Sequence, residues 1–440
     1  MTMMRMVVAL AAAVLMALPA RAAVEIEEVT SPGGIRAWLV EEPSIPFVAL
    51  ELRFRGGASL DAEGKRGAIN LMTALLEEGA DDMDAQAFAA ARDAMAASFS
   101  FDVGDDSLSV SARFLTETRD EAVELLRAAL VAPRFDADAI ERVRAQVISN
   151  IRSSAKDPNR IAGRSFDSLA FGTHPYGTSR NGTEDSVAAL TRDDLIAAHG
   201  RVLARDRVYV SAVGDIDAET LGAVIDRLLA DLPQVGAPMP PEVAVALEPG
   251  VTVVDYESPQ SVVVFGHAGI DRHDPDFFPA YVLNHILGGG GFGSRLMAEL
   301  REKRGLTYGV ASYLVPMDLA ATYQGSFASA NDKVAEAVAL VRDEWAKLAA
   351  EGVTAEELEA AKTYLTGAYP LRFDGNAPIA RILVGMQMDD LPTSYVETRN
   401  AKVEAVTLED VARVAARILR PEALHFVAVG RPEGLATPAN

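Results

Sequence analysis

Cysteine is absent from the 440-residue sequence, which excludes disulfide bonds and thiolate chemistry. No segment beyond residue 22 is apolar over a length that could cross a bilayer, so we expect no membrane span in the mature chain. Basic residues are also under-represented, with 41 Lys and Arg against 63 Asp and Glu and a formal net charge of −22. Nucleic acids and anionic lipids bind basic surfaces, so neither is an expected partner.

Metal-binding and nucleotide-binding patterns are missing as well. No two of the six histidines stand four residues apart, the helical spacing of a pair of zinc ligands, which disfavours an independent peptidase with a relocated metal site. His267 and His273 flank a loop with Asp271 and Asp274, a pattern more typical of a polar turn than of an ion site. The glycine run 288–291 lacks the Gly-Lys-Ser/Thr of a phosphate-binding loop.

The first 22 residues differ from the rest of the chain. Arg5 precedes a short apolar run, Val7 to Leu18, and Ala20-Arg21-Ala22 matches the small-x-small cleavage signal of an exported protein. The apolar run is too short for a membrane anchor. We therefore expect residues 1–22 to be a cleaved signal peptide, and a cysteine-free exported chain suits the bacterial periplasm.

Alternating apolar and polar residues predict strands at 47–55 and 107–114. A further strand is predicted at 207–214, among segments with helical periodicity. The order of these elements favours an α+β fold, in which helices cover one face of a mainly antiparallel sheet. The helical segments are 117–131, 137–154, 159–171, 191–204 and 217–231.

The second half of the chain repeats the first. A proline-rich stretch within residues 233–250 is typical of a linker, and the pattern of elements restarts after it. Seven positions match at a constant offset of 216 residues, which indicates duplication of one domain. We therefore expect domains at 23–232 and 251–433, followed by a tail at 434–440. The matched pairs are Val187 and Val403, Thr191 and Thr407, Asp194 and Asp410, Leu195 and Val411, Leu203 and Leu419, Val213 and Val429, and Gly214 and Gly430.

Four segments in a fixed order carry a family resemblance. They are Phe47–Arg55 with Gly56-Gly57-Ala58 and a helix starting near Gly67, then His174-Pro175-Tyr176-Gly177, then Gly288–Gly291 leading to Ser294-Arg295-Leu296, and finally Leu300–Tyr308. With them the mature chain resembles the pitrilysin/insulinase family of zinc peptidases, in its half-length bacterial form. The resemblance implies two duplicated domains of the pitrilysin/insulinase type.

The chain departs from that family where the zinc should bind. The family's helical His-x-x-Glu-His motif falls on Asn70, Thr73 and Ala74, and its third ligand, a glutamate, falls on Asn150. A supporting carboxylate falls on Val143. An amide, a hydroxyl and a methyl group cannot replace two imidazoles and a general base. The degenerate zinc site implies no metal in this chain.

A second functional element of the family is retained. Its members hold the substrate backbone near the zinc with an arginine and a tyrosine seven residues apart, and Arg301 and Tyr308 match that spacing. Ser294 is expected to cap a helix that ends at Gly305, with Arg301 in its last turn and Tyr308 opening the strand 308–315. By residue type alone both placements are ordinary structure, so the role comes from the resemblance.

The resemblance thus implies a non-catalytic, substrate-positioning subunit of a heterodimeric periplasmic zinc metallopeptidase that acts on peptides or unfolded segments. The chain alone would be inactive. Its expected partner is a half-length homologous subunit that carries His-x-x-Glu-His and the zinc, although the sequence leaves a homodimer open. The alternative is a metal-free structural or peptide-binding scaffold subunit with no role in proteolysis, as metal-free relatives are in respiratory complexes.

Overall fold

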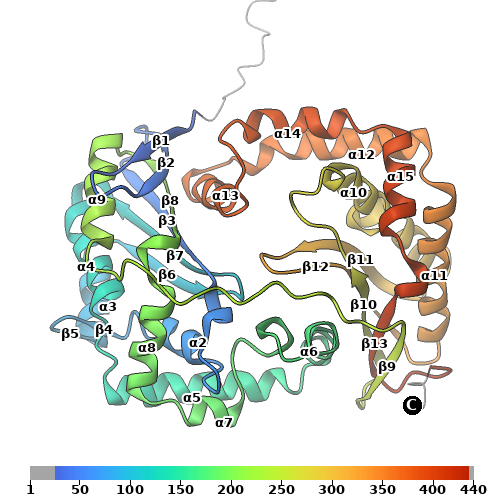
Figure 1. Cartoon of the computed structure of the whole chain (residues 1–440), viewed down its shortest axis with the longest axis horizontal. Helices are drawn as coiled ribbons and strands as arrows, with labels where there is room; N and C mark the ends of the chain where they lie inside the picture. The colour runs from blue at the N-terminus through green and yellow to red at the C-terminus, as the bar shows by residue number, and fades with distance from the viewer. Residues whose placement is uncertain (1–24, 436–440) are drawn as a thin grey trace, which may run out of the picture.

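The computed structural model describes residues 25–435, so the predicted signal peptide at 1–22 lies outside the described residues. The chain forms two side-by-side halves, each built on one large sheet (Figure 1). In the first half the strand order is β1-β2-β8-β3-β7-β6, and in the second it is β11-β12-β10-β13-β9. The bounds are β1 (Glu27–Thr30), β2 (Arg36–Glu41), β3 (Phe47–Arg55), β6 (Ser98–Val103), β7 (Ser107–Leu115), β8 (Val208–Gly214), β9 (Gly250–Asp255), β10 (Gln260–Ala268), β11 (Thr307–Pro316), β12 (Ala321–Ala330) and β13 (His425–Gly430).

Each sheet contains one parallel pair, β2 with β8 and β13 with β9, and its other pairs are antiparallel. Helices pack against both sheets, so the α+β class and the mainly antiparallel sheets are confirmed. A separate two-stranded ribbon joins β4 (Gly79–Ala80) and β5 (Met83–Asp84). The helices are α2 (Ala68–Thr73), α3 (Ala85–Ala94), α4 (Arg119–Val131), α5 (Ala137–Ser154), α6 (Pro158–Phe171), α7 (Glu184–Ala188), α8 (Arg192–Val202), α9 (Ala218–Leu229), α10 (Phe277–Asn284), α11 (Val334–Glu351), α12 (Ala355–Ala368), α13 (Asn376–Met388), α14 (Tyr395–Glu404) and α15 (Leu408–Ile418).

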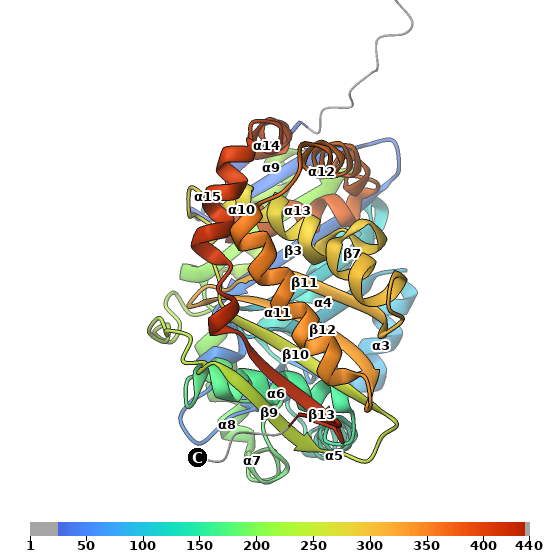
Figure 2. The same ribbon diagram turned by 90° about the vertical axis from the view of Figure 1, so that its right-hand side faces the viewer.

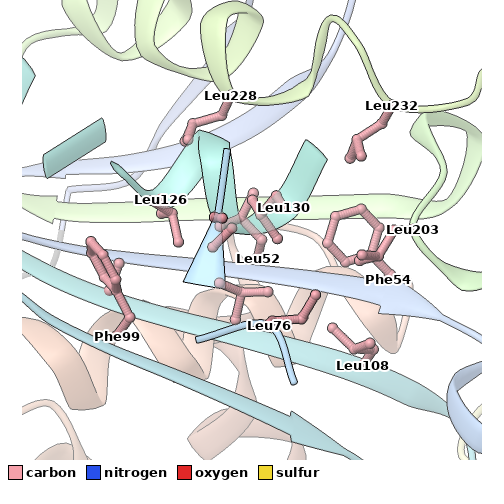
Figure 3. Packing of buried hydrophobic residues seen from close by; sticks show 14 of the residues in the cluster. Leu52, Phe54, Leu76, Phe99, Leu108, Leu126, Leu130, Leu203, Leu228 and Leu232 are labelled. Atoms are coloured by element: carbon pink, nitrogen blue, oxygen red, sulfur yellow. The ribbon is translucent and has the colours of Figure 1, made fainter. Parts of the chain in front are cut away.

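The core of the first half lies between its sheet and the helices on one face. Leu52 and Phe54 of β3 alternate with polar neighbours and are fully buried, and Leu52 stands opposite Val110 of β7. Figure 3 shows these side chains meeting leucines of α4 and α9, among them Leu126 and Leu228. Burial of such apolar surface, at roughly 25 cal/mol per Å², is the main force that holds the helices on the sheet.

The two halves repeat one another element by element. Thr191 and Thr407 begin equivalent helices, α8 and α15, and each forms a capping box with the residue three positions on, Asp194 or Asp410. The strands that follow, β8 and β13, each pair in parallel with one neighbour and antiparallel with the other. The duplication predicted from the sequence is therefore confirmed in the fold.

Each half also lends one helix to the inner face of the other half's sheet, the face turned toward the centre of the molecule (Figure 1). Helix α6 packs on β10 and β13, and α13 packs on β3 and β8 (Figures 1 and 2). Ser211 donates a hydrogen bond to the Ala380 carbonyl at 2.7 Å, which joins β8 to α13. The expectation that helices cover only one face of each sheet is thus incomplete, because the second face holds a helix from the other half.

Residues between Leu229 and Gly250 form neither helix nor strand and cross from one half to the other (Figure 1). The predicted linker at 233–250 lies in this stretch except for Gly250, which is the first residue of β9. Two backbone hydrogen bonds hold this stretch against the rest of the chain. The Val243 amide donates to the Leu319 carbonyl and the Ala246 amide donates to the Ala170 carbonyl, both at 2.9 Å. Within residues 25–435, no helix combines the length and the apolar character that a membrane crossing needs.

The exchanged helix α6 carries a carboxyl group whose titration we expect to affect stability. Burial, with a smaller contribution from Asp105, raises the pKa of half-buried Asp167 to about 7. The folded pKa lies above the usual Asp value, so the carboxyl group lowers stability progressively as the pH rises from about 4 to 7. Asp167→Asn should therefore raise the free energy of unfolding by about 1–2 kcal/mol at pH 8 and by less at pH 5. Urea unfolding at both pH values measures this.

The matched control for that measurement is Asp343→Asn, which changes an exposed aspartate on α11. It should shift stability by less than about 0.5 kcal/mol at either pH. An equal gain for Asp167→Asn at pH 5 and pH 8 would contradict the assigned titration.

Candidate functional site

The helix that would carry the zinc motif is short and tightly capped. Gly67 precedes α2 with a φ of +95°, and a Cβ there would lie 2.8 Å from the Asn181 carbonyl oxygen, so only glycine fits. The Asp61 carboxylate accepts hydrogen bonds from the amides of Gly67 and Ile69, each at 2.8 Å, and so satisfies the start of the helix. The start of this helix is therefore hydrogen-bonded, although its side chains at the positions of the zinc motif are not metal ligands.

The predicted degenerate positions lie on that helix and on its neighbour. Thr73 is buried and its hydroxyl donates to the Ile69 carbonyl at 2.7 Å, so it is engaged within the helix. Asn70 lies on the same helix, three residues before Thr73. Ala74 is the C-cap residue that follows the helix. Asn150, on the adjoining α5, accepts a hydrogen bond from Gln146 of the same helix at 3.0 Å.

These residues do not fit zinc. None of the four supplies an imidazole or a carboxylate, and Val143, at the position of the supporting carboxylate, is buried apolar packing. In the part of the chain that the structure describes, no group of three His, Cys, Asp or Glu side chains could hold a metal ion. We therefore assign no reaction step to a metal in this chain.

The histidines that the sequence singled out have structural roles. His174 bonds the Pro241 carbonyl through Nε2 at 3.1 Å, which holds the linker against the His-Pro-Tyr-Gly turn. Trp345 donates to Nε2 of His267 at 3.1 Å, and burial lowers the pKa of His267 to about 4. The neighbouring loop is a polar turn, as expected, because Asp274 forms an ion pair with Arg417 at 2.5 Å.

Arg301 lies on a helical segment that contains a π-helical turn, Met297–Glu302. Its guanidinium group stacks over the ring of Phe292 at 4.4 Å, and Phe292 is itself 66% exposed. Arg301 has no ion pair with any carboxylate of residues 25–435. A guanidinium held by an aromatic face keeps its hydrogen-bond donors free for another molecule.

The two ends of this helical segment differ in how well they match prediction. Ser294 does not cap it as expected, because the hydroxyl of Ser294 donates to the Gly291 carbonyl at 2.8 Å and stabilises the glycine loop instead. Gly305 does end it, with a φ of +60° and an amide that donates to the Arg301 carbonyl at 3.0 Å.

Tyr308 lies at an irregularity in the strand that follows. Strand β11 begins at Thr307, one residue before the predicted start, and its register against β12 shifts between Thr307 and Val310. The Thr307 hydroxyl donates to the Ala328 carbonyl of β12 at 2.7 Å and fixes the shift. A bulge of this kind redirects a side chain, and Tyr308 is 86% exposed.

The glycine-rich loop between α10 and Arg301 is shaped by close packing. A Cβ at Gly288 would lie 2.4 Å from the Ser312 hydroxyl, and Gly291 has a φ of +58°. A second π-helical turn, His285–Gly289, enters the loop, and such turns are frequent at functional sites. Phe292 is not among the predicted site residues, although an aromatic residue between two glycines of this loop is a usable signal.

This region offers two hydrogen-bond donors, the half-buried Arg301 guanidinium and the exposed Tyr308 phenol. Both can donate hydrogen bonds to a peptide carbonyl, and neither can activate water. The arrangement therefore suits binding and polarisation of a substrate whose bond is broken by groups from elsewhere.

Comparison with known proteins relates the chain to a family of zinc peptidases and to inactive domains of that family. Residues 36–184 match the family model described as insulinase, peptidase family M16, and residues 189–365 match the one described as peptidase M16 inactive domain. The chain is 27% identical to the non-peptidase homolog YmxG of Helicobacter pylori, over 84% of this chain and 86% of that protein. It is 26% identical to an uncharacterized zinc protease of Mycobacterium leprae, over 89% and 88% of the two chains.

Solved structures show the same architecture. A peptidase M16 inactive domain from Pseudomonas fluorescens superposes with a TM-score of 0.87 and 29% identity, covering 94% of this chain and all 100% of that one. A protease from Helicobacter pylori superposes with a TM-score of 0.83 at 16% identity, over 92% and 99% of the two chains, and shares the fold.

Proposed function

Because the chain belongs to the insulinase family of peptidases, M16, and its zinc positions hold no ligand, we propose that it is the substrate-positioning subunit of a heterodimeric zinc metallopeptidase. A separate half-length homologue would supply the zinc and the general base. The observation that carries the proposal is the pairing of a degenerate zinc helix with Arg301 and Tyr308, whose side chains form no ion pair or hydrogen bond with a described residue. The comparisons support the coarser statement that the chain is an inactive M16 homologue.

In this proposal Arg301 and Tyr308 bind the substrate, and Phe292 positions Arg301. The Arg301 guanidinium and the Tyr308 hydroxyl donate hydrogen bonds to a carbonyl of the bound peptide. As that oxygen gains negative charge during attack by a water held on the partner, the two donors bind it more strongly. The Phe292 ring holds Arg301 from one side, so the guanidinium need not be ordered anew when substrate arrives.

The proposed location is the periplasm, on the basis of the signal-peptide pattern in residues 1–22. The proposed substrates are peptides or unfolded protein segments, because the two donors recognise backbone carbonyls and no particular side chain.

Mixing experiments test the assembly directly. The mature chain, a homologue from the same genome that carries His-x-x-Glu-His, and an equimolar mixture are each assayed on a quenched fluorescent peptide. We expect the mixture to hydrolyse the peptide at least about tenfold faster than the zinc-bearing chain alone. The reason is that loss of a single hydrogen-bond donor to a developing oxyanion typically lowers the rate by about 100-fold or more. The mature chain alone should be inactive.

Two results would argue against the subunit proposal. Equal rates for the zinc-bearing chain with and without its counterpart would remove any catalytic contribution. Co-purification of the two chains without a gain in rate would identify a scaffold instead.

A further inference from the structure

A cavity of about 830 Å³ lies between the two halves, away from Arg301 and Tyr308, which do not line it. The first half contributes Arg53 of β3 and the turn between β6 and β7, and the second contributes α10, α13 and α14. Its size falls in the range of roughly 300–1,000 Å³ that is typical of ligand-binding pockets. Because both halves form its walls, the cavity exists only in the docked arrangement of the two domains.

The charge of this cavity is opposite to that of the chain as a whole. Three aspartates and five arginines line it, so its walls carry a formal excess of positive charge in a chain with a net charge of −22. One sign of charge within a concave site attracts a ligand of the opposite sign. The arginines are Arg53, Arg272, Arg372, Arg381 and Arg399.

Two of the arginines each lie close to two aromatic rings. The Arg272 guanidinium lies 4.4 Å from the Phe277 ring and 5.5 Å from the Tyr395 ring. The Arg399 guanidinium lies 4.6 Å from the Tyr369 ring and 5.4 Å from that of Tyr281. Stacking of this kind fixes the guanidinium planes and lowers the entropy lost when an anion binds.

Most of this positive charge has no carboxylate partner within the described residues. Arg272 faces Asp389 at 3.6 Å, whereas Arg399 is only 5% exposed and hydrogen-bonds neutral groups, such as the Leu365 carbonyl at 2.7 Å. Arg53 leaves a buried Nε without a hydrogen-bond partner. Tyr369, 8% exposed and part of the lining, likewise has a buried hydroxyl with no partner. Buried donors without acceptors are costly unless a ligand satisfies them.

We propose that this cavity binds a carboxylate-bearing peptide segment. Guanidinium groups match carboxylates in planar, two-bond geometry, and the apolar lining, which includes Phe278, Ile382 and Met386, suits aromatic or aliphatic side chains next to the acidic one. The site is separate from Arg301 and Tyr308 and needs no partner subunit, so its test is independent of the proposed peptidase assembly.

Calorimetric titration of the mature chain tests the proposal with two octapeptides, one of alternating Phe and Glu and one of alternating Phe and Gln, both acetylated and amidated. The acidic peptide should bind at least about tenfold more tightly than its amide counterpart. A double substitution, Arg372→Gln with Arg381→Gln, should weaken binding of the acidic peptide about tenfold, because both side chains are exposed at the cavity and have no ion pair with a described residue.

The matched control is Arg36→Gln with Arg160→Gln, which removes two exposed arginines outside the lining and should change the affinity less than twofold. Equal binding of the two peptides, no binding at millimolar concentration, or an equal loss in both double variants would overturn the proposal. Displacement of the peptide by free glutamate or phosphate at the peptide's own concentration would also overturn it, since the ligand would then be a small anion.

Discussion

Arg301→Ala should lower the kcat/KM of the assembled peptidase by about 100-fold while leaving assembly intact. Loss of one preorganised donor to a developing oxyanion typically costs about 10²–10³ in rate, roughly 3 kcal/mol. The effect should be this large because no neighbouring group replaces the guanidinium, which contacts only Phe292 among the described ring systems. Hydrolysis of a quenched peptide by an equimolar mixture of the mature chain and its zinc-bearing partner measures it.

The matched control is Arg304→Ala, which removes a guanidinium one turn away. Arg304 forms an ion pair with Glu299 at 2.6 Å, so its loss should change kcat/KM less than twofold. Tyr308→Phe removes only a hydroxyl and should cost about tenfold. Similar rates for Arg301→Ala and Arg304→Ala would show that Arg301 has no part in catalysis.

Leu383→Ala should destabilise the chain by about 3 kcal/mol, the largest stability effect that we expect from one substitution. Leu383 of α13 is fully buried, in a cluster that joins α13 to Trp38, Ala49 and Val213 of the first sheet. Truncation of a buried leucine to alanine removes its packing and leaves a cavity, at about 2–5 kcal/mol. Urea unfolding of the mature chain, followed by far-ultraviolet circular dichroism, gives the change in midpoint.

Leu371→Ala serves as the control, because Leu371 is 78% exposed and close in sequence to α13. It should shift stability by less than about 0.5 kcal/mol. Equal midpoints for the two variants would mean that α13 does not hold the halves together.

Local sequence patterns predicted the individual elements well. Strand 47–55 and helix 137–154 have the observed bounds of β3 and α5, because strict two-residue alternation and an amphipathic stripe identify them without long-range information. Helix 191–204 is two residues shorter at its C-terminal end and starts at Arg192, since Thr191 is its cap. The duplication was visible because caps and strand ends repeat at a fixed offset.

What depends on contacts between the halves could not be predicted in this way. The sequence of α13 contains no local signal that it covers β3 and β8 of the other half, where the polar residue Glu51 of β3 is only 3% exposed. The π-helical turn at Arg301 and the register shift at Tyr308 arise from packing of the glycine loop and from Thr307. The cavity arginines are dispersed from Arg53 to Arg399 in the sequence, so no spacing motif reveals them.

The exchange of α6 and α13 makes each half depend on the other for folding. Without its counterpart, either sheet would expose the apolar face that the exchanged helix covers. We therefore expect that cleavage of the connecting segment between Leu229 and Gly250 would give two fragments that stay folded only while bound to each other.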